Sequence, residues 1–294
     1  MSKATNLIGL IYNPRISEAK KLALRVKDGL GLNETWLASA LDVEQFHQQM
    51  ERTSLVITFG GDGTILRAAH LSSPYSVPIL GVNLGRVGFI AEIKADQALE
   101  KIPHYLDGDS WIEERLMLMA TLLPGGKGAN GDGREAIHAL NDVVVGRGTE
   151  SNMIDIEARI DGALFTTYRA DGLIVATATG STGYSLSAGG PIVHPEMKVI
   201  ILQPVASHLC MSECVVIPSE ASVELKLHGP YDATLSIDGF SHFNLSPGDR
   251  VVVQKSPHMA RFLRAHPRSR FYGTLTQRLG IGTPRMPNNG ENSK

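Results

Sequence analysis

The sequence predicts an α/β N-terminal domain with a mostly parallel sheet, followed by an all-β C-terminal domain that forms a sandwich. In the first half of the chain, short apolar runs alternate with segments whose apolar residues recur at helical spacing, which is typical of a sheet covered by helices. In the second half, many short strands follow one another between turns rich in Gly, Pro, Asn and Asp, which favours antiparallel pairing. A length of 294 residues allows two domains of ordinary size.

The elements of the first half follow from apolar spacing and from residues that start or stop helices. In order, they are a strand over 7–12 ended by Asn13-Pro14, a helix capped by Ser17 and stopped by Gly29, a strand over 54–59, a helix over 64–71 and a strand over 78–82. Strand, helix, strand and helix in this order imply parallel strands joined by crossover helices.

The second half is predicted as strands with few helices between them. The strands are 137–145, 154–160, 164–168, 173–177, 199–203, 214–217, 222–227, 234–237 and 250–254. A short helix follows Gly180, and a last helix covers 274–279. We expect residues 1–115 to form the α/β domain and 116–260 the sandwich, with about 260–280 packing back on the first domain. The polar segment 283–294 is predicted to be a disordered tail.

Composition excludes some classes of protein. The formal net charge of −2 argues against a general nucleic-acid binder. No apolar run approaches the roughly 20 residues that span a bilayer, and no signal-peptide pattern opens the sequence. The two cysteines, Cys210 and Cys214, are too few for a disulfide framework, so we interpret them as buried or inert thiols in a cytoplasmic protein.

The turn Gly60-Gly61-Asp62-Gly63 follows a buried strand and precedes a helix. Ligands bind at this edge of open parallel sheets, and glycines let the backbone approach a phosphate near a helix N-terminus. Asp62 places one carboxylate there, where it can meet a hydroxyl. The alternative is a plain tight turn in which Asp62 caps the helix.

Three further segments carry polar groups at strand ends. Asn83 to Phe89 has glycines and an arginine that suit a phosphate, although a plain loop fits equally. Asn141-Asp142 interrupts an apolar strand and suits a ribose diol or an adenine edge, or else marks a bulge. The densest segment runs from Arg169-Ala170-Asp171-Gly172 to the hydroxyl- and glycine-rich 179–191, which suits a nucleoside with its phosphates better than a flexible linker would.

In this order and spacing, these motifs resemble the NAD kinase family from residue 6 to about residue 280. The Gly-Gly-Asp-Gly turn alone is shared with lipid kinases and phosphofructokinases, whereas the segment 179–191 is typical of NAD kinase. The resemblance implies transfer of the terminal phosphoryl group of ATP to the 2′-hydroxyl of the adenosine ribose of NAD, with Mg²⁺ on the donor phosphates, in a homodimer or homotetramer. It implies a site in the cleft between the domains, with Asp62 as catalytic base. The implied NAD-binding residues are Asp62, Gly63, Arg67, Asn141, Asp142, Asn152, Arg169, Asp171, Thr182, Gly183, Tyr184, Ser185, Leu186, Ser187 and Ala206.

The sequence departs from the family pattern at a few positions. Asp142 stands where Glu is frequent, and Ala178, Gly183 and Phe240 replace Pro, Ala and Gln. Two rivals stay open: a lipid kinase, which should expose an apolar or basic membrane face, and a non-enzymatic dinucleotide sensor. Turnover of NAD with ATP separates all three.

Overall fold

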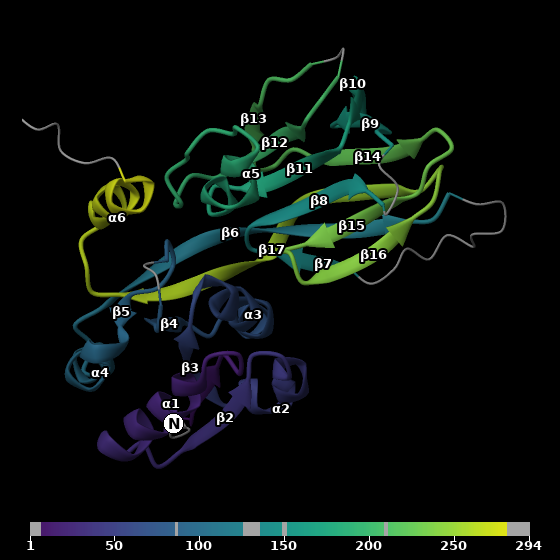
Figure 1. Cartoon of the computed structure of the whole chain (residues 1–294). Coiled ribbons are helices and arrows are strands. Elements are labelled where there is room, and N and C mark those ends of the chain that lie inside the picture. Colours follow the sequence, from purple (N-terminus) through teal and green to yellow (C-terminus); the bar gives the residue numbers. More distant parts are fainter. Residues whose placement is uncertain (1–6, 86–87, 126–135, 149–151, 209–210, 281–294) are drawn as a thin grey trace, which may run out of the picture.

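The structure is a computed structural model that describes residues 7–85, 88–125, 136–148, 152–208 and 211–280. It confirms the predicted fold class, because an α/β part with parallel strands precedes an antiparallel sandwich (Figure 1). The predicted tail, 283–294, lies outside the described residues, as does Cys210.

The α/β part is built on four parallel strands in the order β4-β3-β1-β2. Their bounds are β1 Leu7–Tyr12, β2 Thr35–Ser39, β3 Thr53–Gly60 and β4 Ile79–Asn83. The helices are α1 Ser17–Gly29, the short α2 His47–Met50, α3 Asp62–Ser72 and α4 Ala98–Leu106. Helices α1 and α4 share a core with Leu10, and α3 shares another with Ile11, so the sheet is buried on both faces. Apolar strands without polar alternation are the consequence.

Ser17 is the first residue of α1 and not its cap, which corrects the prediction. The N-cap is Ile16, with no side-chain capping bond. The chain already turns after Asn13, since the N–H of Ile16 donates to the carbonyl of Asn13, so the helix begins one residue after the turn closes.

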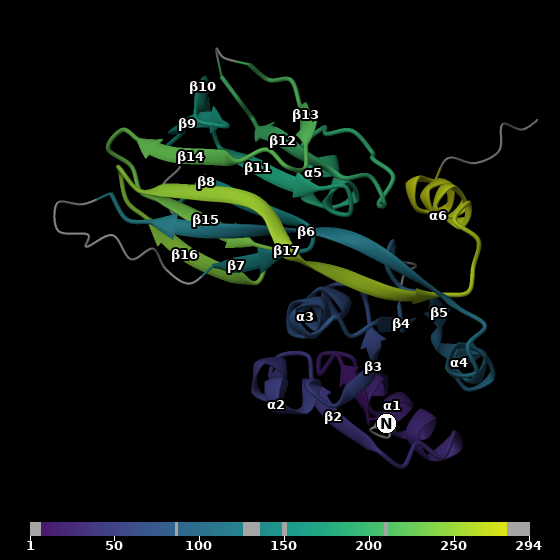
Figure 2. The same ribbon diagram turned by 180° about the vertical axis from the view of Figure 1, so that it is seen from behind.

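Two long strands join the α/β part to the sandwich. β6 (Trp111–Leu123) and β17 (Arg250–Arg264) pair antiparallel along their length, and Phe262 of β17 also pairs in parallel with Ile79 of β4. One sheet of eleven strands therefore runs through both parts of the molecule (Figure 2). The boundary expected at residue 115 falls inside β6, and the division into domains stays a prediction.

The sandwich packs that sheet against a second, six-stranded sheet in the order β13-β12-β11-β8-β15-β16. Its core draws on both sheets and includes the fully buried Tyr168. The remaining bounds are β5 Ile93–Lys94, β7 Ile137–Ala139, β8 Asp142–Arg147, β9 Ile154–Ile160, β10 Ala163–Ala170, β11 Gly172–Thr177, β12 Val199–Val205, β13 Val215–Pro218, β14 Val223–His228, β15 Ala233–Ile237 and β16 Ser241–Leu245.

Some predicted elements differ from the observed ones. The strand over 137–145 is two strands, because the backbone leaves the ladder at Leu140 and Asn141. The last strand runs to Arg264 rather than residue 254, through a register shift between Lys255 and Met259 that contains Pro257. The short helix after Gly180 is α5 (Tyr184–Ser187), and the last helix, α6 (Arg270–Leu279), begins four residues earlier than predicted.

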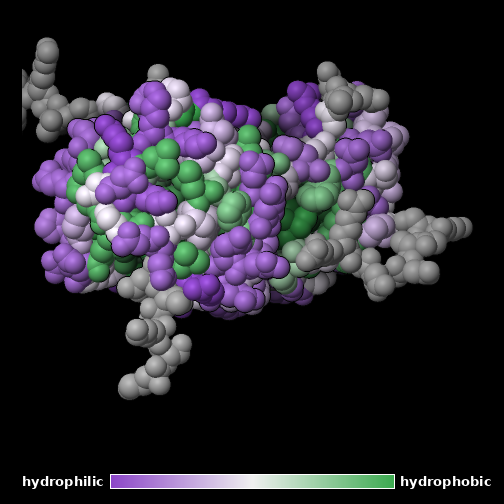
Figure 3. All heavy atoms as spheres, turned by 90° about the horizontal axis from the view of Figure 1, so that it is seen from below, coloured by the Kyte–Doolittle hydropathy of each residue, from purple (hydrophilic) through white to green (hydrophobic). Residues whose placement is uncertain are grey.

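The surface seen from below is mostly hydrophilic, with hydrophobic residues between the hydrophilic ones (Figure 3). Across the described ranges, no helix is both long and apolar enough to cross a membrane. Cys214 is a free, half-buried cysteine, and burial raises the pKa of its thiol, so little of it is the reactive thiolate.

Candidate functional site

The Asp62 carboxylate is held by the segment that follows β4. The N–H of Phe89 donates to Oδ2 at 2.9 Å, and the N–H of Ile90 to Oδ1 at 3.4 Å. Gly88 passes so close that a Cβ there would meet the carboxylate. Gly61, not Asp62, is the N-cap of α3. The structure therefore overturns the interpretation of Asp62 as a helix cap. Of the glycines in 83–89, Gly88 approaches Asp62, whereas the space beside Gly85 is open.

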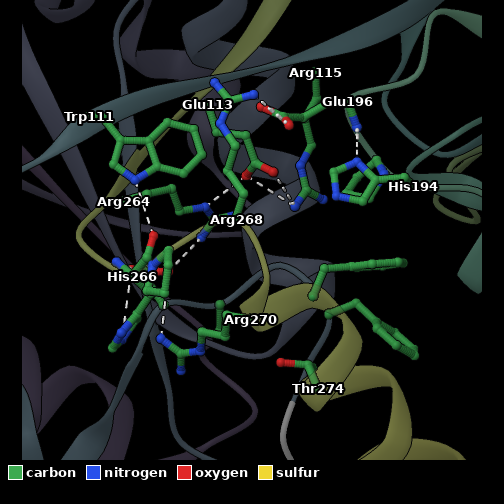
Figure 4. A pocket seen from close by; sticks show the side chains of 16 residues that line it. Trp111, Glu113, Arg115, His194, Glu196, Arg264, His266, Arg268, Arg270 and Thr274 are labelled. Carbon is green, nitrogen blue, oxygen red and sulfur yellow. Dashed lines mark hydrogen bonds and ion pairs between the residues drawn. The ribbon is translucent and has the colours of Figure 1, made fainter.

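A second set of contacts holds the backbone of the segment that follows β4. Arg264 donates through Nη1 to the carbonyl of Ile90 at 2.7 Å, and it pairs with Glu113 at 2.7 Å and Glu92 at 3.1 Å. Figure 4 shows Arg264, Glu113 and Arg115 in a pocket beside α6. Although burial opposes it, Arg115 and Arg264 lower the pKa of Glu113, which stays charged. The buried ion pairs thus fix the backbone that in turn fixes Asp62.

A pocket of about 240 Å³ opens beside the glycine turn. Gly61, Gly63 and Arg67 line it, and the Arg67 guanidinium lies 4.4 Å from the centre of the Phe240 ring. Thr64 is buried, and its hydroxyl has no hydrogen-bond partner in the part of the chain that the structure describes. The N-terminus of α3 and a guanidinium together suit a phosphate chain.

Asn141 and Asp142 lie at the break between β7 and β8. The carboxylate of Asp238 accepts hydrogen bonds from the N–H groups of Leu140, Asn141 and Asp142. Asp142 is buried, and burial, with a smaller effect of the Asp238 charge, raises its pKa to about 7. The predicted bulge is thus a strand break built around a second carboxylate.

The hydroxyl-rich segment packs directly on this break. The Thr177 hydroxyl donates to the carbonyl of Leu140 at 2.6 Å. A Cβ on Gly183 would lie 3.5 Å from Asn141 Nδ2 and 3.8 Å from Asp142 Oδ2, so both side chains face Gly183. Two motifs far apart in the sequence therefore form one surface.

The rest of the predicted loop continues from Gly183. Tyr184 is 48% exposed, so its ring does not belong to the core. Thr182 donates to the carbonyl of Thr179, and the buried hydroxyl of Ser185 has no partner among the described residues. Leu186 and Ser187 complete α5, half-buried and exposed respectively.

Four predicted residues lie elsewhere. Asp171 directly precedes β11, six residues before Thr177, and its N–H donates to the carbonyl of Val205 next to Ala206. Arg169 and Asn152 are exposed side chains. At about 3.3 Å per residue along a strand, this group lies at the opposite end of β11 from Gly183, and the structure does not bring it to Asp142.

Sequence reasoning missed His70 and Asp238 as members of the site. His70 Nε2 lies 2.8 Å from Asp238 Oδ2, which connects α3 to the β15–β16 turn. The only signal in the sequence was the pair Asp238-Gly239, which is typical of an ordinary hairpin turn. In the structure both residues have positive φ.

The fold and the site together define a class. A carboxylate in a Gly-Gly-Asp-Gly turn at the carboxyl end of a parallel strand, facing an antiparallel sandwich, marks the kinases that share this turn. Models of the ATP-NAD kinase N-terminal domain and C-terminal domain match residues 41–110 and 140–265. The chain belongs to the NAD kinase family.

Individual relatives agree with this assignment. The chain is 42% identical over 275 residues to an NAD kinase of Dehalococcoides mccartyi (strain CBDB1), over 92% of this chain and 95% of that protein. An NAD kinase from Archaeoglobus fulgidus, solved in complex with ATP, aligns with a TM-score of 0.72 and 25% identity over 92% of this chain and 98% of its own. Yeast NADH kinase complexed with NADH shares the fold, with a TM-score of 0.83 and 22% identity over 100% and 91%. These matches confirm the predicted family and class of enzyme.

Proposed function

We propose that this kinase transfers the terminal phosphoryl group of ATP to the 2′-hydroxyl of the adenosine ribose of NAD, giving NADP. The observation that carries the proposal is the Asp62 carboxylate, fixed by the Phe89 and Ile90 N–H groups at the glycine turn. There it accepts or orients the proton of the attacking hydroxyl. Because the transition state of phosphoryl transfer is loose, positioning and charge neutralisation supply most of the catalysis.

The acceptor is bound by the surface that Asn141, Asp142 and Gly183 form with α5. Carboxylate and amide groups beside several hydroxyls suit ribose and adenine edges. Tyr184, half-exposed at the rim, offers a ring on which a base can stack. Arg169, Asp171, Asn152 and Ala206 are proposed as further NAD-binding positions on the strength of the family resemblance.

The donor phosphates occupy the pocket beside the glycine turn, next to Arg67 and the N-terminus of α3. Among the residues that the structure describes, no cluster of three or more His, Cys, Asp or Glu could hold a metal ion. Mg²⁺ would accompany the donor, held by phosphate oxygens and water, and would neutralise phosphate charge. The residues of the chain then bind and orient the donor phosphates.

We infer a cytoplasmic enzyme that forms a homodimer or homotetramer. The outer strands of the two sheets, β10 and β13, expose Leu164, Phe165 and Val216, and such edges favour pairing with another copy. The free Cys214 suits a reducing compartment.

The test is turnover of NAD with ATP by the purified chain and by Asp62→Asn. We expect NADP formation by the wild type. Loss of the general base should lower the turnover number by about 10²–10⁴-fold, while the variant folds and still binds NAD. Phosphorylation of a lipid rather than NAD, or NAD binding without turnover, would reject the proposal. More than about a tenth of wild-type turnover in the variant, well above that range, would remove Asp62 from the chemistry.

A further inference from the structure

Asp238 is the most completely bonded carboxylate near the site. It lies in the turn between β15 and β16, and its side chain has no solvent exposure. The N–H of Leu140 donates to Oδ2 at 2.8 Å, and those of Asn141 and Asp142 donate to Oδ1 at 2.7 and 3.0 Å. His70 Nε2 lies 2.8 Å from Oδ2. A carboxylate has room for about four donors, so this one is fully used.

Three of the four partners are the backbone groups of the strand break. A buried N–H without a partner is costly, and here the ladder supplies none, because β7 ends at Ala139 and β8 begins at Asp142. Asp238 replaces the missing ladder with one rigid acceptor. It thereby fixes the peptide planes that carry the side chains of Asn141 and Asp142 toward Gly183.

The fourth partner belongs to the other half of the molecule. His70 lies on α3, the helix that begins at Asp62. Its ring also contacts the edge of Phe240, with 4.8 Å between the ring centres. A single buried carboxylate therefore connects the backbone of the Asn141-Asp142 pair to the helix that carries Asp62.

We propose that Asp238 is the positioning residue of phosphoryl transfer, which sets the place of bound NAD relative to Asp62 through the 140–142 backbone on one side and His70 on the other. The inference rests on the proposed function of Asp62 and Asp142. Its energetic basis is that a misplacement of about 1 Å between reacting groups can lower a rate about 10²-fold.

The charge of Asp238 should affect the pH dependence of NAD binding, which a purely structural role would leave unchanged. Burial first, and then the Asp238 charge, raise the pKa of Asp142, and His70 on α3 is bonded to Asp238. His138 and His258 lie beyond it, and burial first, then His258 and His70, lower the pKa of His138. If the ionised Asp142 carboxylate accepts hydrogen bonds from the ribose hydroxyls, the affinity for NAD should fall as the pH is lowered through the pKa of Asp142. Removing the Asp238 charge should move that fall to lower pH.

The experiment compares Asp238→Asn with His70→Gln and with the control Asp249→Asn. The amide nitrogen of Asn cannot accept from the Leu140 N–H, so Asp238→Asn loses charge and one acceptor. Asp249 is a matched control, because its carboxylate also braces backbone, accepting from Gly125 and Ser246 at the far end of β17. Measurements are the NAD dissociation constant, kcat, KM, the pH dependence of NAD binding, and urea unfolding, all on the full chain.

We expect Asp238→Asn to raise the NAD dissociation constant by about tenfold or more, because the 140–142 backbone loses the charged acceptor that holds Asn141 and Asp142 in place. The variant should also have a lower kcat, and the pH dependence of NAD binding should shift to lower pH. His70→Gln should lower kcat and leave NAD affinity close to wild type, because the 140–142 bracing remains. Asp249→Asn should change stability alone.

Wild-type NAD affinity and kcat in Asp238→Asn would overturn the inference, whatever its stability. So would equal kinetic losses in Asp249→Asn. Should Asp238→Asn fail to fold, unchanged kcat in His70→Gln overturns it. A wild-type chain that neither binds nor phosphorylates NAD would instead reject the proposed function, which separates the two failures.

Discussion

Replacing Asp142 by Asn should make the protein more stable and a worse enzyme. Asp142 is 7% exposed, and its pKa of about 7 compares with an ordinary value of 3.8. The folded state therefore binds the proton more tightly than the unfolded state does. Stability from this group is present at low pH, falls as pH rises from the unfolded pKa toward 7, and levels off above the folded pKa.

The magnitude follows from the shift. About three pKa units at about 1.36 kcal/mol each give a cost on the order of 4 kcal/mol to the folded state when Asp142 is ionised. An amide of the same shape carries no such cost. Asp142→Asn should therefore raise the free energy of unfolding above pH 7 by up to this amount, with the difference vanishing toward pH 4.

The assay is urea unfolding of wild type and variant from pH 4 to pH 8.5, with the KM for NAD measured at the neutral end. Every other titrating group is common to both proteins, so the difference between the two curves reports Asp142. We expect KM to rise, because the amide offers the ribose diol one acceptor oxygen where the carboxylate offers two. Parallel stability curves would refute the burial argument, and an unchanged KM would remove Asp142 from the NAD site.

Three further outcomes follow from the same contacts. Tyr184→Phe should keep NAD affinity and Tyr184→Ala should lose it at equal stability, and equal kinetics for the two would exclude stacking. Arg264→Met removes the buried cation that Glu92 and Glu113 share, so it should cost about 3–5 kcal/mol in urea unfolding and lower turnover through the Ile90 carbonyl. Arg261→Met, on the same strand but in an exposed pair, should cost less than about 1 kcal/mol, and equal losses would contradict this account. Light scattering should give a dimer or tetramer, and a monomer at micromolar concentration would reject the assembly.

The sequence predicted the parts whose signal is local. Apolar runs located β1, β3 and β4, and the Gly-Gly-Asp-Gly turn placed Asp62 at the carboxyl end of β3. It missed β6, although this strand is half of the longest pairing in the molecule. Glu113 and Arg115 interrupt its apolar pattern. They pair with each other, and Arg264, some 150 residues later, adds a second cation on Glu113.

The same limit explains why the centre of the site was read only in part. Asn141 and Asp142 stood out because polar residues inside an apolar strand require partners. The partner is Asp238, almost a hundred residues away. The sequence of a hairpin turn does not indicate that its carboxylate accepts hydrogen bonds from three backbone N–H groups of another segment. Both Asp62 and Asp142 are thus placed by residues distant in the sequence: the segment 88–90 over Arg264 for one, Asp238 for the other. His70 then connects the second arrangement to the helix of the first, so the geometry of phosphoryl transfer depends on contacts between the two halves more than on either motif alone.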